Sequence, residues 1–291
     1  MTNPSDTLTG DTLEHAAYLA RSENRVRILK TLSSGPYTRR DLVDATGVSS
    51  ATVGRVLTEL QSRGWAKRTQ DGYVATPAGT RVTAEFEPFI GALETIQHLG
   101  DAVDWIPTDE LDIGLHHFTD VTVRRPERYD PADITDFFVD VLQDVSSFRT
   151  LTHLVPIETK ERIMLEGVRS GRLTVDCVMT VGLLDYLREH PEHRARWAEL
   201  LDGGATASRY DAHIPCNLFI LGDLVLLADS HSTSGHPYAC LVSENPTIRS
   251  WAHELIDRYR GKADPIDVDM ISEERSVATE KRPVGDRPSI D

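Results

Sequence analysis

The chain has 291 residues and a formal net charge of −15, from 31 Lys and Arg against 46 Asp and Glu. A hydrophobic content of 40% and a charged content of 26% are those of an ordinary globular protein and exclude a disordered chain. No apolar run approaches the roughly 20 residues that cross a bilayer, and the polar residues 1–11 predict no signal peptide. The three cysteines are few and odd in number, which favours a cytoplasmic protein.

The negative charge is not spread evenly along the chain. Residues 24–81 hold ten Lys and Arg against four Asp and Glu, whereas residues 99–261 hold 15 against 27. A basic cluster confined to one short module is the electrostatic mark of a nucleic-acid binder, although an evenly acidic surface would repel phosphates. Asp outnumbers Glu by 27 to 19, and only five of the basic residues are Lys. This bias is typical of a halophilic host.

Residues 11–76 show the pattern of a small DNA-binding domain. Thr38 and Ser49 each stand before a helical pattern, and Gly47 separates the two helices with a tight turn. Asp71-Gly72 is a strong signal for a hairpin between two short strands. The predicted helices cover residues 11–21, about 24–34, 39–46 and about 50–63, and the predicted strands cover residues 66–69 and 73–75.

The stretch from Tyr37 to Arg68, read as helix, glycine turn and helix followed by a hairpin, closely resembles winged helix-turn-helix regulators of the ArsR, MarR and IclR kinds. The resemblance covers roughly residues 11–98. In that family the second helix of the motif enters the major groove, and the hairpin, or wing, lies along the DNA backbone. The resemblance therefore implies double-stranded DNA as a partner.

Polar and basic side chains fall on the outward faces of these elements. Arg55 lies opposite the apolar face of its helix, where it can contact guanine with two hydrogen bonds. The caps Thr38 and Ser49 present helix N-termini to phosphate. The alternative interpretation is that the arginines are simply solvated and that the module binds protein. The predicted DNA-binding residues are Thr38, Arg39, Arg40, Ser49, Ser50, Thr52, Arg55, Lys67, Arg68 and Tyr73.

Residues 77–99 predict a linking helix with proline at its first position. Its apolar residues recur at alternating spacings of four and three, which is a heptad seam and favours a homodimer. The alternative is that this stripe packs on the chain's own domains. Pro88 predicts a kink or a break in the helix. The seam residues are Val82, Phe86, Phe89, Leu93 and Ile96.

Residues 100–261 alternate between strand and helix patterns, which predicts an α/β domain with a mostly parallel sheet and one hairpin around Gly222-Asp223. The expected fold class is thus a two-domain α/β protein, with the winged helix-turn-helix at the N-terminus. Residues 262–291 lack periodicity and predict a disordered acidic tail. The predicted strands are 111–118, 149–155, 172–181, 205–209, 217–221, 224–228 and 238–242, and the predicted helices are 131–146, 157–169, 182–201 and 246–260.

Residues 214–263 are similar to the C-terminal region of archaeal winged-helix regulators of the methanogenesis-regulatory-protein type, which are numerous in haloarchaea. The marks are the strands around Gly222-Asp223, the turn at residues 243–246, and a last helix with Trp251-Ala252 and Arg258-Tyr259. The similarity is looser over residues 99–261. It implies a domain that senses a small-molecule effector or mediates assembly.

Three polar residues, Asp229, Ser230 and His231, follow a predicted strand of this domain. Ligands of α/β sheets bind beyond the carboxyl ends of strands, so these residues are candidate effector contacts; a solvated turn is the alternative. Cys216 and Cys240 lie near histidines, which leaves open a metal- or redox-responsive switch.

The remaining histidines give little support for a metal site. His116 and His117 are expected to lie on opposite faces of a strand, and His190 and His193 to lie on a helix surface. No hydrolase, nucleotide-binding or zinc-protease motif is present, so no catalytic residue, metal or cofactor is predicted. The leading hypothesis is a cytoplasmic, dimeric, sequence-specific transcription regulator. A small-molecule enzyme fused to a winged helix is an alternative.

Overall fold

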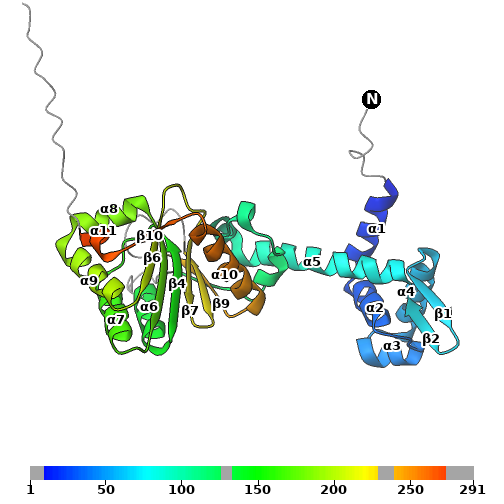
Figure 1. The fold of residues 1–291 in the computed structure, drawn as a ribbon. Helices are drawn as coiled ribbons and strands as arrows, with labels where there is room; N and C mark the ends of the chain where they lie inside the picture. Colours follow the sequence, from blue (N-terminus) through cyan, green and yellow to red (C-terminus); the bar gives the residue numbers. More distant parts are fainter. Residues whose placement is uncertain (1–9, 126–132, 229–238, 273–291) are drawn as a thin grey trace, which may run out of the picture. The chain divides into compact units, whose positions relative to one another are not determined.

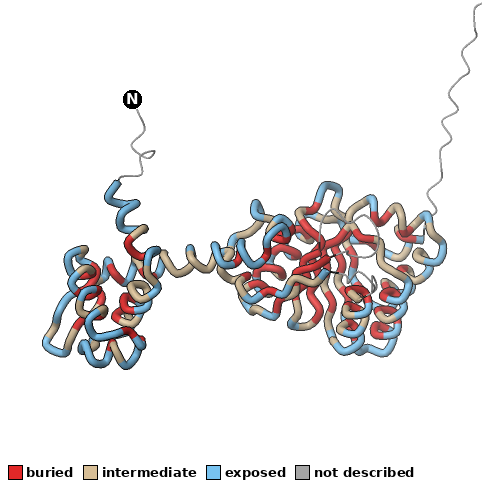
Figure 2. Tube along the Cα trace, turned by 180° about the vertical axis from the view of Figure 1, so that it is seen from behind, coloured by how far each residue is buried: buried red, intermediate tan, exposed pale blue. Residues whose placement is uncertain are grey.

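The computed structural model describes residues 10–125, 133–228 and 239–272. The chain divides into two compact units, Met1–Leu93 and Glu94–Asp291, and the division falls within one long helix, Pro77–Leu99 (Figure 1). Each unit also has its own buried core (Figure 2). Within the described residues, no helix combines the length and the apolarity needed to cross a membrane.

The N-terminal unit has the predicted order of helices followed by a two-stranded hairpin. Its core forms because each helix has one apolar face, with Leu29, Leu42 and Leu60 almost fully buried where these faces meet. Strands β1 and β2 pair antiparallel. The elements are α1 (Gly10–Ala20), α2 (Glu23–Ser33), α3 (Arg39–Thr46), α4 (Ser50–Ser62), β1 (Ala66–Thr69) and β2 (Gly72–Ala75).

Helix α5 (Pro77–Leu99) follows the hairpin and begins at the predicted proline. Thr76 precedes it, and its hydroxyl accepts a hydrogen bond from the Gly79 amide at 3.1 Å. The helix continues through Pro88, so of the predicted kink or break the break does not occur. A single proline removes one hydrogen bond from the helix, and the remaining turns hold the two sides together.

The C-terminal unit is built on an eight-stranded sheet with the strand order β10-β6-β5-β4-β7-β8-β9-β3. Before the sheet, three short 3-10 helices lie at Gly100–Trp105, Thr108–Glu110 and Leu115–Phe118. The strands are β3 (Thr122–Arg124), β4 (Ser147–Thr152), β5 (Thr174–Thr180), β6 (Thr206–Tyr210), β7 (Asn217–Leu221), β8 (Leu224–Ala228), β9 (Cys240–Ser243) and β10 (Asp264–Ile266). The helices are α6 (Asp133–Asp144), α7 (Glu158–Arg169), α8 (Val181–Glu189), α9 (Pro191–Asp202), α10 (Pro246–Arg260) and α11 (Val268–Ser272).

The prediction of a mostly parallel sheet is wrong, because the sheet is mixed. Only the pairs β4–β5 and β5–β6 are parallel among the described strands, and the other five pairs are antiparallel. A parallel pair needs a crossover long enough to return the chain to the same end of the sheet. Helix α7 provides that crossover between β4 and β5, and helices α8 and α9 provide it between β5 and β6. The antiparallel pair β7–β8 is joined directly by Gly222-Asp223 and needs no such helix.

Helices cover both faces of this sheet (Figure 1). One core lies between the sheet and helices α6, α7, α8, α9 and α11. The other core lies between the opposite face and helix α10 together with residues 99–121. The central strands are therefore buried on both faces, as the continuous red of the strands in Figure 2 shows. Their unbroken apolar runs follow from this two-sided burial.

Three further predictions for this unit differ from the structure. Residues 111–118 are not a strand: side chains of α10 hold this segment, with the Trp251 indole donating to the Glu110 carbonyl at 3.1 Å. The expected helix over 182–201 is two helices, because Pro191 begins a new one. The expected disordered tail is ordered over 264–272, where β10 pairs with β6.

Candidate nucleic-acid interface

Helix α3 starts with a complete capping box, which exposes the arginines of its first turn. The Thr38 hydroxyl accepts a hydrogen bond from the Asp41 amide at 3.2 Å, and the Thr38 amide donates to the Asp41 carboxylate at 2.9 Å. This backbone hydrogen bond lowers the pKa of the Asp41 carboxyl. Arg39 and Arg40 follow directly and are exposed.

Helix α4 is set beside α3 by a short turn. Gly47 ends α3 in the left-handed conformation, with φ of 69°, which side chains disfavour. Ser49 then caps α4, its hydroxyl accepting from the Thr52 amide at 3.4 Å. One face of α4 is buried in the core. The opposite face, which includes Ser50 and Arg55, is exposed to solvent.

The hairpin is fixed to the start of α3 through a buried tyrosine. The Tyr73 amide donates to the Tyr37 carbonyl at 2.8 Å, and the Tyr37 amide donates back at 2.9 Å. The Tyr73 ring is only 9% exposed. The guanidinium carbons of Arg39 and Arg68 lie 5.9 and 6.0 Å from the centre of this ring. Tyr73 thus holds two arginines from different elements close together.

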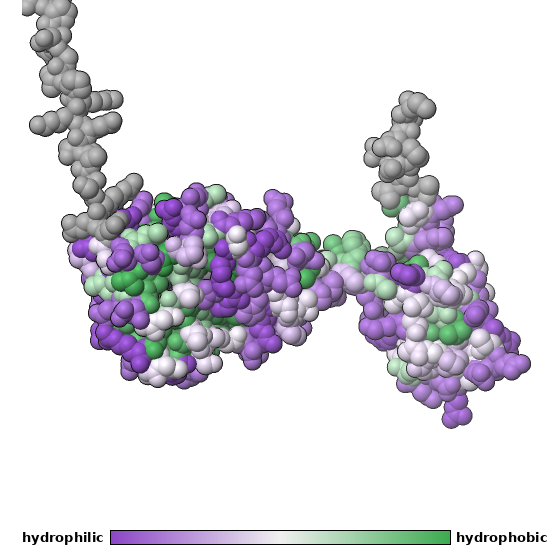
Figure 3. All heavy atoms as spheres, viewed as in Figure 1, coloured by the Kyte–Doolittle hydropathy of each residue, from purple (hydrophilic) through white to green (hydrophobic). Residues whose placement is uncertain are grey.

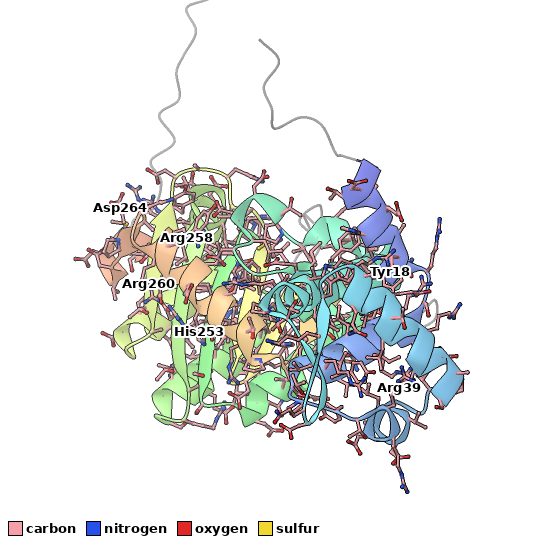
Figure 4. The ribbon with its side chains drawn as sticks, turned by 90° about the vertical axis from the view of Figure 1, so that its right-hand side faces the viewer. Tyr18, Arg39, His253, Arg258, Arg260 and Asp264 are labelled. Atoms are coloured by element: carbon pink, nitrogen blue, oxygen red, sulfur yellow. The ribbon has the colours of Figure 1, made fainter. Side chains whose placement is uncertain are left out.

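Arg39 also faces helix α4. A Cβ atom placed on Gly54 would lie 3.9 Å from the Arg39 guanidinium. The arginine therefore lies between the middle of α4 and the hairpin, on the side labelled in Figure 4. An open groove of about 510 Å³ adjoins it. The residues that line this groove are Thr38, Arg39, Arg68, Thr69, Gln70, Asp71, Gly72 and Tyr73.

The positive charges of α2, α3, α4 and the hairpin fall into two groups. On α2 and at the end of α4 the cations are neutralised: Arg25 pairs with Glu59 at 3.5 Å and Lys30 pairs with Glu87 at 2.7 Å. Arg27 and Arg63 also have carboxylate partners. Among the described residues, no carboxylate forms an ion pair with the cations of α3, the exposed face of α4 or the hairpin. These cations are Arg39, Arg40, Arg55, Lys67 and Arg68.

Most of the predicted DNA-binding side chains are exposed at the surface of α3, α4 and the hairpin. Thr52 is half-buried, and Tyr73 is buried as the support for two arginines. The arrangement offers hydroxyls, guanidinium groups and helix N-termini to one ligand. Sequence reasoning missed Tyr37, whose single strand-like bridge leaves no periodic pattern.

The candidate effector and switch residues have different outcomes. Asp229, Ser230 and His231 lie outside the described residues. Cys216 and Cys240 are fully buried, and burial raises the pKa of each thiol to about 12. A redox sensor needs an exposed thiol with a lowered pKa, so the structure contradicts the proposed cysteine switch.

The predicted arrangement of the histidine pair is also wrong. His116 and His117 belong to a 3-10 helix, and their ring centres are 4.1 Å apart rather than on opposite faces of a strand. His193 contacts the buried carboxylate of Glu161 at 2.8 Å. Throughout 10–125, 133–228 and 239–272, no three His, Cys, Asp or Glu side chains are grouped as metal ligands would be.

Two family models match the chain in the two regions just described. Residues 13–98 match the HVO_A0261 N-terminal domain, and residues 131–262 match the middle domain of methanogenesis regulatory protein FilR1. No curated protein matches the chain. The match to a regulatory family favours a regulatory role over an enzymatic one.

Solved structures resemble the chain only distantly. TrmBL2, described as an archaeal chromatin protein with a novel mode of DNA binding, is 14% identical with a TM-score of 0.40; the match covers 87% of this chain and 99% of that one. The phospholipase D family member Nuc from Salmonella typhimurium is 9% identical with a TM-score of 0.41, covering 51% and 99%. An O-methyltransferase family protein from Burkholderia thailandensis reaches a TM-score of 0.26 at 11% identity, covering 71% and 65%. The family model for residues 131–262 supports a regulatory role for the protein.

Proposed function

We propose that the protein is a sequence-specific, DNA-binding transcriptional regulator whose N-terminal unit is a winged helix-turn-helix. The observation that carries this proposal is the set of five cations without ion-pair partners among the described residues, gathered on α3, α4 and the hairpin. Unpaired, exposed arginines and lysines attract phosphates, while the cations of α2 and at the end of α4 are neutralised. The family model that matches residues 13–98 covers α3, α4 and the hairpin together.

In this proposal helix α4 enters the major groove of DNA. Arg55 reads a base edge from the exposed face of α4, and Ser50 lies near the start of that face. Arg39 and Arg68, supported by Tyr73, contact the phosphate backbone at one edge of the groove. Two copies, joined through α5, place two α4 helices on half-sites about one turn of DNA apart. The C-terminal unit senses an effector and changes the DNA affinity of the dimer.

The test is recovery of a binding site followed by a matched pair of variants. Genomic DNA fragments captured by the purified chain are sequenced, and the shared motif defines the operator. Arg55→Ala is expected to weaken operator binding by about 1–3 kcal/mol and to leave binding to unrelated DNA unchanged.

Lys30→Ala is the control, because Lys30 of α2 is exposed but paired with Glu87 of α5. It should leave both affinities unchanged. If Arg55→Ala weakens operator and unrelated DNA equally, Arg55 contacts only phosphate. Failure to recover any shared motif, with equal effects of the two variants, contradicts the proposal.

A further inference from the structure

An apolar cavity lies in the C-terminal unit between the sheet and helices α6, α7 and α9. The side chains of Phe138, Phe148, Phe219 and Trp197 form much of its wall. Residues at the end of β4 and in the loop that follows it complete the wall, so the cavity lies near the carboxyl end of this strand. Its free volume for the centres of water molecules is about 40 Å³, which admits a few water-sized groups.

One charged side chain, Lys160 of α7, stands in this apolar wall. The side chain is only 7% exposed, and its Nζ atom lies 3.8 Å from the centre of the Phe138 ring. Among the described residues no carboxylate forms an ion pair with it. A buried ammonium without a counter-charge is strongly unfavourable. Lys160 therefore supplies a positive charge to the cavity with no anion of the described chain to balance it.

The neighbouring carboxylate does not serve as that anion. Glu161 is fully buried and accepts hydrogen bonds from His193 at 2.8 Å, Arg196 at 2.6 Å and the Trp197 indole at 2.9 Å. These donors all belong to α9, so Glu161 holds α7 against α9. This bond network leaves Lys160 on the cavity side of α7.

The surroundings of Lys160 favour a ligand in the cavity that carries a single negative group. The N-cap of α7, Ile157, makes no side-chain hydrogen bond, so the amides of the first turn add partial positive charge near Lys160. The hydroxyls of Thr150 and Thr152 already donate, to the Leu218 carbonyl at 2.9 Å and to Asn217 Oδ1 at 3.0 Å. They cannot donate to a second anion. The rest of the wall is apolar.

We propose that this cavity binds a small monocarboxylic acid with an apolar body. The carboxylate pairs with Lys160 Nζ, and the body contacts the rings of Phe138, Phe148 and Phe219. A sugar would leave its hydroxyls without partners against these rings, and a phosphate dianion would face a single cation. The role of this cavity as an effector site rests on the proposed regulatory function. Binding of the acid itself is tested without DNA.

The experiment measures binding of a panel of small acids, from acetate to butyrate, and of their amides to the full chain by calorimetry. Each acid that fits is expected to bind at least tenfold more tightly than its amide. Lys160→Met should reduce acid binding by at least tenfold and leave amide binding unchanged. Lys262→Met is the matched control, because Lys262 is exposed, and it should bind like the parent chain.

A second variant tests the cavity itself. Cys177→Val adds apolar volume inside the wall and keeps Lys160, so it should weaken acid and amide alike. Circular dichroism confirms that each variant is folded. Equal binding of acids by the parent chain and Lys160→Met, or no binding of any acid at millimolar concentration, overturns the proposal. If an acid binds through Lys160 without changing operator affinity, the site stands and the regulatory role of this unit fails.

Discussion

Gly54, in the middle of α4, is a glycine that contacts within the N-terminal unit do not require. A glycine in the middle of a helix is about 1 kcal/mol less favourable than alanine. A Cβ atom at this position would make only an ordinary contact with Arg39, at 3.9 Å. Packing inside the unit therefore does not require glycine here. The outer side of α4, where we propose that DNA lies, is the side on which an added methyl group matters.

Lys160 is expected to weaken the fold that holds it. Burial lowers its pKa from an ordinary value of 10.5 to about 8. Below pH 8 both the folded and the unfolded chain carry the proton, so the folded chain bears the full cost of the buried charge, about 3 kcal/mol. Lys160→Met should therefore raise the free energy of unfolding at pH 7 by up to that amount.

The pH dependence follows from the same shift. Between about pH 8 and pH 10 the folded chain loses this proton while the unfolded chain keeps it, so the parent chain gains stability relative to the variant. Urea unfolding of both proteins at pH 7 and at pH 9.5 measures the difference. A difference that stays constant between the two pH values contradicts this account.

The sequence predicts the residues of the candidate DNA interface better than it predicts Lys160 of the cavity. The caps Thr38 and Ser49 and the exposed Arg55 are set by neighbours within one helical turn, and the sequence pattern places them correctly. Lys160 has no such local signal. It stands third in a helix, where a lysine is ordinarily solvated, and it is buried only because α6 and the sheet close over it.

Among the elements, α5 resolves the two interpretations of its apolar stripe. Val82 and Phe86 pack against the core of the N-terminal unit. Phe89, Leu93 and Ile96 remain 56%, 41% and 42% exposed. Their spacing of four and three places them on one face of the helix, and Figure 3 shows apolar surface along this stretch. The first part of the seam thus serves internal packing, and the second part is free for the homodimer we propose.

A charge placed in the exposed part of the seam should separate the dimer. Leu93→Glu is expected to convert the dimer to a monomer, since a buried carboxylate without a partner opposes association. Light scattering with size-exclusion chromatography measures the mass. Ala84→Glu adds the same charge to an exposed position on the opposite side of α5 and should leave the dimer intact. An unchanged mass for Leu93→Glu shows that the seam does not join two chains.

Apolar periodicity predicts some elements of the C-terminal unit correctly and fails for others. Helices α6, α7 and α10 begin and end close to the predicted positions, because each has its own apolar stripe. Residues 111–118 have a strand-like apolar pattern but form 3-10 turns. Contacts from α10 decide this, since Arg258 and the Tyr259 hydroxyl both bond to the Glu110 carboxylate. No local pattern encodes a partner so far along the chain.

On the scale of the whole molecule, the net charge of −15 does not oppose DNA binding, because the two units carry it differently. In the C-terminal unit many acids are paired with arginines: Arg149 bonds to Asp176 and Asp257, and Arg260 contacts the same two carboxylates. His253, Arg258 and Arg260 lie along α10 (Figure 4). The cations left without carboxylate partners on α3, α4 and the hairpin therefore define where DNA approaches.

Salt separates the contributions of phosphates and bases to DNA binding. If all five of these cations paired with phosphates, affinity would fall about 500-fold between 0.5 and 2 M KCl. The Asp-rich, Lys-poor composition favours a halophilic host, so we expect operator affinity to fall by less than tenfold. Fluorescence anisotropy with operator and unrelated DNA measures both curves. Parallel collapse of the two curves shows that phosphates carry the binding.

The sequence by itself determined the helix-turn-helix, the hairpin, the start of α5 and most helices of the second unit. Caps, turns and apolar periodicity act between residues a few positions apart, so the local sequence contains the cause. Only the tertiary structure decided the mixed strand order, the burial of Cys216 and Cys240, and the cavity around Lys160. These depend on contacts between distant residues, such as Phe138 with Phe219, which form only when the sheet and helices assemble.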